Sequence, residues 1–405
     1  MTDHERPVGG RIVTRPVVVL AVFALVMVVL LGVRLFTGLG AISHISNGYP
    51  WGIWKPLNVV TFTGIGAGAF ASALLVYVLN RGEYHRLVRS AVLAGAVAYT
   101  LAAFSVAVDL GRWWNLWKIP VMVWRWNPSS ILLEVALCVM TYMMVLWVEF
   151  APAIAERLSR VGPPWVRRSA VLMSRVLKRA LPWVIPLAMV LPTMHQSSLG
   201  SLFLLTPTKL HPLWHTSFLP ALFLLSCLSM GYAALVVLDA LESLVWGSPR
   251  ERVLLGRLGV VAGGMEIAWV VIRLVDLAVR GRLGLVLSSG GLLTGCFLAE
   301  IVLFGGSAVL VLVPRFRRSM AGLFGIALMM LLGGALYRFD TYLVAFNPGP
   351  GWHYFPSVGE ILFSLGLGAI GVLVFILGVK LFPVLAPHAA SAAELDHTVG
   401  APAGH

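Results

Sequence analysis

Charged residues and cysteines are scarce in this sequence. Only 12% of its 405 residues are charged, whereas 59% are hydrophobic and the mean hydropathy is +0.89. A water-soluble domain cannot be built with so few charges, so the solvent of this chain must be a membrane. The three cysteines, Cys138, Cys227 and Cys296, lie far apart in apolar runs, which argues against an iron–sulfur cluster and against a disulfide framework.

What the sequence does contain is a series of long apolar stretches. A membrane-spanning helix needs about 20 mostly apolar residues. Ten stretches satisfy that length, namely residues 17–38, 57–79, 90–110, 130–152, 180–199, 215–240, 257–279, 286–313, 320–339 and 358–383. We therefore predict an all-α, multi-pass protein of the bacterial inner membrane.

The positions of Lys and Arg predict the orientation of these helices. Every even-numbered connection is basic, and loops rich in Lys and Arg stay in the cytoplasm. Both termini are therefore expected on the cytoplasmic side, and topology explains the net charge of +13. That charge does not indicate a nucleic-acid partner, because the sequence has no soluble domain with a basic groove and interleaved aromatic residues.

A faint internal repeat suggests how the helices are grouped. A shift of 167 residues, or of 166 for the last pair, places His44 on His211, Gly64 on Gly231, Tyr99 on Glu266, Asp109 on Asp276 and Glu134 on Glu300. Because each unit would hold four helices, an even number, the two copies would run parallel. We predict two parallel four-helix bundles, helices 2–5 and helices 6–9, flanked by helices 1 and 10.

This grouping sets the predicted domain boundaries. They are a cytoplasmic tail (1–16), flanking helix 1 with its outward loop (17–56), the first bundle (57–200), the second bundle (201–340), an outward loop with flanking helix 10 (341–385) and a disordered cytoplasmic tail (386–405). The first bundle is expected to hold the reactive site.

The odd-numbered connections differ from the basic ones, because they are long, aromatic and polar. They read SHISNGYPWGIWKP, GRWWNLWKIPVMVWRWNP, HQSSLGSLFLLTPTKLHPLWHT and FNPGPGWHYFPS. A tryptophan belt at the membrane interface accounts for isolated aromatic residues. It explains poorly why polar residues are packed into the same loops, since polar groups at that depth need partners or a function.

Ionisable residues inside a bilayer are costly, so each is a functional candidate. In the seventh helix Glu266, Arg273 and Asp276 fall on one face, with Glu266 about 15 Å deeper than Asp276. Two interpretations remain open, a ladder of titratable groups or a buried arginine–carboxylate pair that only holds helices together. Glu300, in the middle of the eighth helix, is a further candidate for proton transfer.

Helices 3 and 4 carry a matching set of candidates, namely Tyr99, Asp109, Arg112, Glu134, Tyr142 and Glu149. Asp109 and Arg112 are expected at the outer end of helix 3, with Tyr99 about 15 Å further in. Tyr142 and Glu149 are seven residues apart and share one face of helix 4. Glu134 has no cationic neighbour in its helix, which favours proton binding and release over a purely structural carboxyl.

The histidines argue against haem and against any resident metal. A bis-histidine haem needs imidazoles on facing helices well inside the span. Here His195 and His215 are expected at helix ends, and the others near the membrane are in outward loops, namely His44, His211 and His353. His195, Gln196 and Ser197 closely follow Pro192, where an interrupted helix end would expose donors to a quinone carbonyl. The alternative is a histidine that only caps a helix.

Five segments of the sequence resemble a known family. They are NGYPWGIWKPLNVV (47–60), DLGRWWNLW (109–117), HQSSLGSL (195–202), KLHPLWHT (209–216) and GWHYFPSVGEI (351–361). In these motifs the sequence resembles the NrfD-like, polysulfide-reductase-type membrane subunits that react with quinones, and in particular the HybB branch associated with hydrogenase-2-type nickel–iron hydrogenases. The resemblance extends over nearly the whole chain.

The resemblance implies a subunit without its own redox metal. Its partners would be a periplasmic iron–sulfur protein and the large and small subunits of a nickel–iron hydrogenase, and its substrate would be menaquinone or ubiquinone held near the outward face. Tyr99 and Glu134 match positions where the family places groups for quinone-linked proton transfer. The quinone head group would be oriented by His195, Asp109 and Arg112 and would pack beside Trp113 and Trp114. Protons would reach it through Glu149, Tyr142, Glu134 and Tyr99.

Other functions stay open at this point. A quinol-oxidising subunit of another reductase, or of an assembly resembling alternative complex III, would show the same motifs. A secondary transporter would fit parallel repeats and mid-membrane carboxylates, although the polar residues here crowd the outward edge. A passive anchor would need only one helix.

Overall fold

The computed structural model describes residues 7–248 and 252–385, and within them it is all-helical apart from one isolated antiparallel bridge between Leu210 and Phe346. Ten helices are long and apolar enough to cross a membrane, as predicted. Their main helical segments are α1 (Arg15–Thr37), α2 (Phe62–Gly66) with α3 (Gly68–Ala73), α4 (His85–Asp109), α6 (Ile131–Val161), α7 (Pro164–Ser201), α8 (Leu219–Trp246), α9 (Arg252–Val279), α11 (Gly291–Leu312), α13 (Met320–Phe339) and α14 (Val358–Leu381). The tail predicted to be disordered, 386–405, lies outside the described residues.

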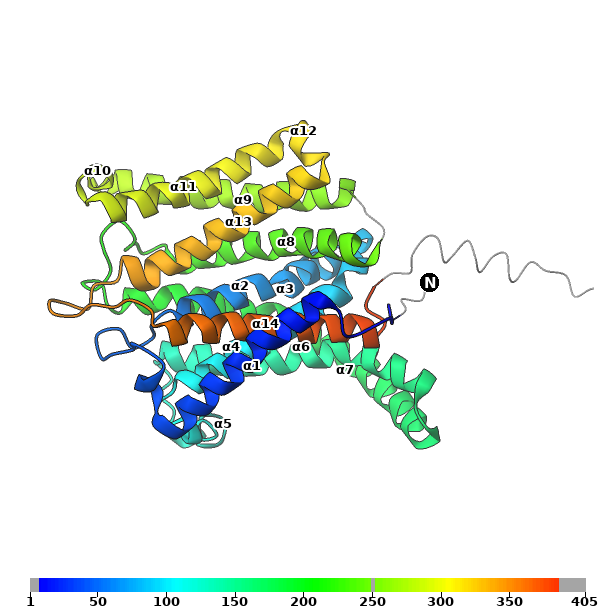
Figure 1. Cartoon of the computed structure of the whole chain (residues 1–405). Coiled ribbons are helices and arrows are strands. Elements are labelled where there is room, and N and C mark those ends of the chain that lie inside the picture. The colour runs from blue at the N-terminus through cyan, green and yellow to red at the C-terminus, as the bar shows by residue number, and fades with distance from the viewer. Residues whose placement is uncertain (1–6, 249–251, 386–405) are drawn as a thin grey trace, which may run out of the picture.

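The spanning helices lie side by side, so their connections gather at two opposite ends (Figure 1). One end, called here the basic end, holds the start of α1, the connection between α6 and α7, the short helix α12 (Pro314–Arg317) and the end of α14. The other, called the aromatic end, holds the long outward connections with the short helices α5 (Lys118–Val121) and α10 (Leu285–Ser288). The Val8 amide donates to the Val379 carbonyl at 3.3 Å, so both described chain ends meet at the basic end.

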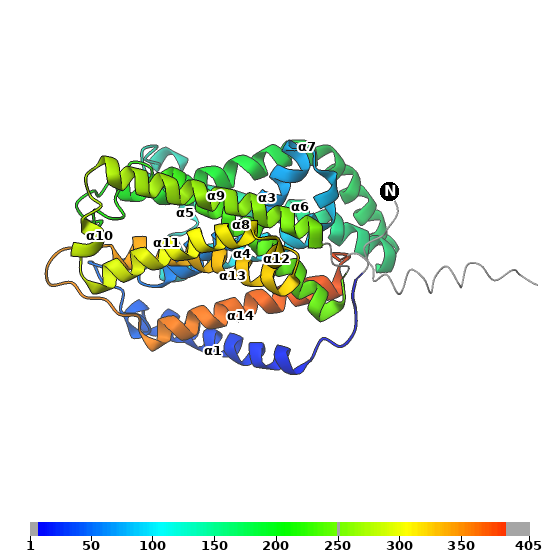
Figure 2. The same cartoon turned by 90° about the horizontal axis from the view of Figure 1, so that it is seen from above.

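Neighbouring helices pack mostly in chain order. Helix α4 contacts α6, α6 contacts α7, and α8, α9, α11 and α13 form a second group of neighbours. The two groups meet where α2 and α3 contact α8, while α1 packs on α14 and α14 on α4 (Figure 2). Helix α7 of the first group also contacts α8 of the second, and the grouping into helices 2–5 and 6–9 and the domain boundaries both stay predictions.

The basic connection between the fourth and fifth spans is helical, not a loop. Helix α6 continues to Val161 and α7 begins at Pro164, so only a tight turn separates them. Arg, Leu and Ala favour helix, and a proline at the first helical position is compatible with starting one. The hairpin therefore extends beyond the apolar stretches.

The predicted interruption of the fifth helix after Pro192 was wrong. Helix α7 runs through Pro192 to Ser201, and the hydroxyl of Thr193 donates to the Met189 carbonyl at 2.8 Å. Pro192 leaves the Ala188 carbonyl without its intrahelical donor, a break that membrane helices tolerate when neighbouring groups surround it. The irregular backbone lies instead in the second span, Lys55–Val78, which has π-helical turns at both ends and a turn at Ala67.

Glycines allow the second span to approach α8 closely. A Cβ atom on Gly231 would lie 2.8 Å from the carbonyl oxygen of Ala67, and one on Gly64 would lie 3.1 Å from the sulfur of Met230. Gly64 and Gly231 are mates in the predicted repeat, and both lie where the two helix groups cross. Small residues at such crossings let membrane helices pack backbone to backbone.

Replacing Gly231 with Ala is expected to destabilise this crossing. The added methyl group would press on the Ala67 carbonyl, and forcing extra volume into a packed interior costs about 1–3 kcal/mol. Gly264 on α9 is the matched control, because a Cβ there meets nothing within 4 Å and Gly to Ala in a helix stabilises by up to about 1 kcal/mol. Thermal unfolding in detergent should shift in opposite directions for the two variants. Equal shifts would contradict the close approach.

Candidate functional site

Four of the predicted site residues meet in the core of the first helix group. The ring centroids of Tyr99 on α4 and Tyr142 on α6 are 4.6 Å apart, and those of Tyr99 and His195 on α7 are 5.8 Å apart. Gln196 lies beside them, with its Nε2 donating to the Thr63 hydroxyl at 3.1 Å. All four side chains are buried, so α4, α6 and α7 place one imidazole, one amide and two phenols in a shared interior.

His195 does not lie at a helix end, which corrects the sequence-based expectation. Helix α7 continues to Ser201, so the imidazole is held inside the helix, fully buried. The expectation failed because proline was assumed to end the helix. The burial also argues against a simple capping role, since capping side chains lie at helix termini.

Arg338 on α13 is the functional residue that sequence reasoning missed. Its Nη2 donates to Gln196 Oε1 at 3.3 Å, and its Nε donates to the Val60 carbonyl at 3.1 Å. Its Nη1 donates to the Ser226 hydroxyl at 3.1 Å and to the Gly334 carbonyl at 2.9 Å. The Val60 carbonyl lies within the π-helical turn Lys55–Thr61. A signal was present in the sequence, because Arg338 and Asp340 interrupt an otherwise apolar span.

These contacts fix the hydrogen positions of the site. Arginine only donates, so Gln196 must turn Oε1 toward Arg338 and its NH2 group toward Thr63 and His195. The Gln196 Nε2 lies 3.5 Å from His195 Nδ1, the long limit of a hydrogen bond, so Nδ1 is the acceptor. In neutral imidazole the proton then sits on Nε2. His195 thus offers Nε2–H as a donor.

Three polar atoms of this group have no partner at full hydrogen-bond geometry among the described protein atoms: the hydroxyls of Tyr99 and Tyr142 and Nε2 of His195. The Tyr99 hydroxyl also lies close enough to the Gln196 side chain to interact with it. An unsatisfied buried polar group costs about 1–3 kcal/mol, and such groups are rare in native interiors. Three of them among aromatic rings could all be satisfied by a ligand that accepts hydrogen bonds. A quinone carbonyl has that property.

The other predicted head-group residues form a separate set at the aromatic end. Asp109 ends α4 and pairs with Lys55 at 2.5 Å, ten residues and about 15 Å along the helix from Tyr99. Arg112, Trp113 and Trp114 follow in the connection and are exposed. The structure therefore does not bring these four residues into contact with His195.

The remaining candidates lie along α6 and α7. Glu134 is in the first turn of α6 and interacts electrostatically with Cys138. Glu149 lies seven residues along α6 from Tyr142, toward the basic end, and acts on it electrostatically. Tyr142 in turn packs on Tyr99. The predicted proton series through Glu149, Tyr142, Glu134 and Tyr99 stays a prediction. The hydroxyl of Ser197 donates only to carbonyls of its own helix, those of Thr193 and Met194.

The second helix group holds its own buried charges. Arg273 on α9 pairs with Glu300 on α11, whose other oxygen accepts from the Trp214 indole at 2.8 Å. Four rings surround the guanidinium at 5.5–6.0 Å, those of Trp214, Trp269, Phe297 and Tyr337. Glu266 instead accepts from Ser229 and Ser307, and Asp276 pairs with Arg280. The three charged residues of α9 that the sequence analysis singled out therefore have separate partners.

Fold and site together define a class: a multi-pass membrane protein with a buried polar site inside a helix bundle. A family model described as "Polysulphide reductase, NrfD" matches residues 40–345. The chain belongs to this NrfD family. The family resemblance of the sequence motifs is thus confirmed, as is a multi-pass protein of the bacterial inner membrane.

Two curated relatives cover nearly the same length. The chain is 36% identical over 392 residues to the "Probable Ni/Fe-hydrogenase 2 b-type cytochrome subunit" of Escherichia coli (strain K12), covering 96% of either chain. It is 24% identical over 373 residues to the "Menaquinone reductase, integral membrane subunit" of Nitratidesulfovibrio vulgaris (strain Hildenborough), covering 86% of either chain.

The cytochrome name of the first relative raises the question of haem. Within residues 7–248 and 252–385, His195 is the one histidine inside a membrane span away from its ends, and its ring meets Tyr99 and Gln196. A bis-histidine haem b needs a second imidazole facing it. The same residues hold no group of three or more His, Cys, Asp or Glu side chains placed to bind a metal. This part of the chain therefore does not supply the two facing imidazoles of a bis-histidine haem b.

Replacing Tyr99 with Phe should cost the isolated chain little stability, because its hydroxyl makes only a contact with Gln196 that falls short of full hydrogen-bond geometry. Tyr342 is the matched control, since it is equally buried but its hydroxyl donates to the Leu199 carbonyl at 3.1 Å. Tyr342→Phe should cost about 1 kcal/mol. Thermal unfolding of both variants in detergent measures the difference, and a larger loss at Tyr99 would show that its hydroxyl is bonded within the protein.

Proposed function

We propose that this chain is the membrane subunit of a respiratory oxidoreductase that exchanges electrons with a lipid-soluble quinone, menaquinone or ubiquinone. The proposal rests on three buried polar atoms, one each from Tyr99, Tyr142 and His195, that lack partners at full hydrogen-bond geometry. The rings that carry these atoms pack against one another between α4, α6 and α7. Membership of the NrfD family supports it, as does the similarity to a menaquinone reductase subunit.

The head group would be bound by donors on three helices. The Nε2–H of His195 and the hydroxyl of Tyr99 would donate to a quinone carbonyl, and Tyr142 would donate through its own hydroxyl. Charge that develops on the quinone oxygen during reduction makes these bonds stronger, because hydrogen bonds to charged acceptors are about twice as strong as neutral ones. The site would therefore stabilise the reduced quinone more than the oxidised one.

Electrons would come from a partner protein at the aromatic end. The similarity to the E. coli hydrogenase 2 subunit supports a periplasmic iron–sulfur subunit and the large and small subunits of a nickel–iron hydrogenase as partners. The exposed Arg112, Trp113 and Trp114 are suitable docking residues there. If neighbouring genes encode another reductase instead, the same membrane subunit would oxidise quinol, the alternative function.

Reduction of a quinone by two electrons also takes up two protons. Tyr142, which packs on Tyr99 and is under the electrostatic influence of Glu149, would link the head group to Glu149 toward the basic end. Glu134, which acts electrostatically on Cys138, would supply protons from the other side. Protons taken through Glu149 would cross part of the membrane while electrons arrive from the aromatic end. Turnover would then store membrane potential.

Gln196→Glu tests the hydrogen-bond chain from Arg338 to the quinone. A carboxylate only accepts, so His195 would turn its proton to Nδ1 and lose the donor on Nε2, although the side chain keeps its size. Quinone-linked turnover of the complex should fall about tenfold or more, the effect of losing one strong hydrogen bond. Dye-linked activity of the partner subunits should survive. Ser197→Ala is the control, because Ser197 bonds only to its own helix, and equal losses in both variants would reject the assignment.

Glu134→Gln tests the proton route. If Glu134 delivers protons, a side chain of the same shape that cannot carry one should abolish quinone-linked turnover, while dye-linked oxidation by the partner subunits persists. The quinone-linked and dye-linked activities are measured on the same purified complex, and their ratio is compared between the variant and the unmodified protein. Unchanged quinone activity would remove Glu134 from the route without affecting the quinone site.

A further inference from the structure

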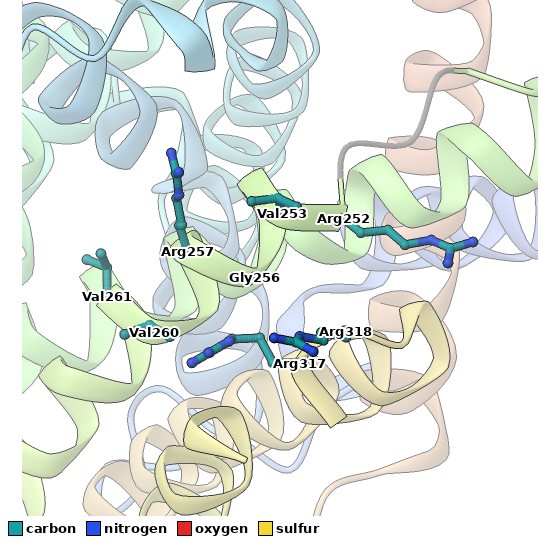
Figure 3. Close-up of a pocket in the computed structure, with 8 residues that line it drawn as sticks. All are labelled: Arg252, Val253, Gly256, Arg257, Val260, Val261, Arg317 and Arg318. Atoms are coloured by element: carbon teal, nitrogen blue, oxygen red, sulfur yellow. The ribbon is translucent and has the colours of Figure 1, made fainter. Parts of the chain in front are cut away.

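A hollow of about 800 Å³ lies at the basic end between the start of α9 and α12. It is lined by Arg252, Val253, Gly256, Arg257, Val260, Val261, Arg317 and Arg318. In Figure 3, Arg317 and Arg318 face the side of α9 that carries Gly256, whereas Arg257 points away from them. The lining thus combines four arginines with four apolar or small residues.

Among the residues that the structure describes, only one arginine of this hollow has an acidic partner. Arg257 is paired, since it donates to both carboxylate oxygens of Glu83 at 3.3 and 3.4 Å. For Arg252, Arg317 and Arg318, the described residues provide no carboxylate within ion-pair distance. An uncompensated cluster of guanidinium groups attracts anions, and its planar forks match phosphate oxygens.

The lining of the hollow changes from basic to apolar along α9. Nine residues separate Arg252 from Val261, about 13 Å at 1.5 Å per residue, and the direction leads from the basic end into the span. Val253 is 73% exposed and Val261 is 39% exposed, so the apolar wall is open to the membrane. Gly256 keeps the centre free, because a Cβ there would lie 3.0 Å from the Arg317 side chain.

We propose that this hollow binds an anionic phospholipid of the leaflet at the basic end. Arg317, Arg318 and Arg252 would hold the phosphodiester, and one acyl chain would lie along Val253, Val260 and Val261. A free anion would use only the arginines and leave the valine wall unexplained. Basic pockets between membrane helices on the cytoplasmic side are suited to such head groups. The proposal is independent of the quinone site.

Binding of anionic lipid could also result from the general positive charge of the basic end, because every connection there is basic. That explanation predicts that lipid binding follows the total charge and not its position. The double variant Arg317→Gln/Arg318→Gln removes two charges from the hollow. Its matched control, Arg81→Gln/Arg315→Gln, removes two exposed charges from the same end that do not line the hollow.

The test is native mass spectrometry of the full-length, delipidated chain in detergent. It is titrated with cardiolipin, phosphatidylglycerol, phosphatidylethanolamine or inorganic phosphate. We expect retention of one anionic phospholipid in preference to phosphatidylethanolamine. Apparent affinity should be about tenfold lower in the hollow variant, the loss of at least one charge-assisted hydrogen bond, and nearly unchanged in the control.

Val253→Glu provides a second variant, whose folding should be undisturbed because the Val253 side chain is largely exposed. It leaves all arginines in place but supplies a carboxylate that competes for them, so it should reduce lipid retention as the double variant does. Equal losses in the hollow variant and its control would overturn the proposal in favour of general charge. Displacement of the lipid by millimolar phosphate would overturn it in favour of a free-anion site.

Discussion

A guanidinium buried inside the bundle, that of Arg338, sets the arrangement of the reactive core. In lipid no water satisfies its donors, so the protein must supply acceptors. No carboxylate among the described residues pairs with it; its donors go to the Val60 and Gly334 carbonyls, the Ser226 hydroxyl and Gln196. The Val60 carbonyl in the π-helical turn of the second span and the Oε1 of Gln196 both accept hydrogen bonds from this guanidinium. The hydrogen on His195 Nε2 follows from the resulting orientation of the Gln196 amide.

The second helix group shows what happens when a buried guanidinium has a carboxylate instead. Arg273 pairs with Glu300 and is enclosed by four aromatic rings. Aromatic faces stabilise a cation most when water is excluded. The two buried guanidinium groups differ in their partners. Arg273 pairs with the carboxyl group of Glu300, whereas Arg338 donates to neutral groups. Neutral, oriented donors such as His195 suit a neutral ligand like a quinone, so the first group, not the second, is the better place for one.

The sequence predicted the ten spans well, because bilayer thickness imposes their length and apolarity on each one. It also identified Tyr99, Tyr142, His195 and Gln196, since polar residues in apolar helices are conspicuous. It could not show that Asp109 pairs with Lys55, because that contact depends on how two helix ends meet. It placed His195 at a helix end because proline usually breaks helices in water, where no neighbouring hydroxyl and no apolar solvent favour continuation. Arg338 was overlooked because its partners come from three other helices.

The two ends of the molecule differ in the groups that they offer for electron and proton transfer. Electrons can cross short distances through protein, but protons need a series of groups that bind and release them. The buried phenols of Tyr99 and Tyr142 touch edge to face, and Glu149 follows seven residues further along α6, about 10 Å toward the basic end. In the proposed function electrons would therefore enter at the aromatic end, where docking residues are exposed, and protons at the other. Because Tyr99 lies about 15 Å inside the span from the aromatic end, the proposed site would receive electrons from one end and protons from the other, and charge separation would follow from where the polar side chains are buried.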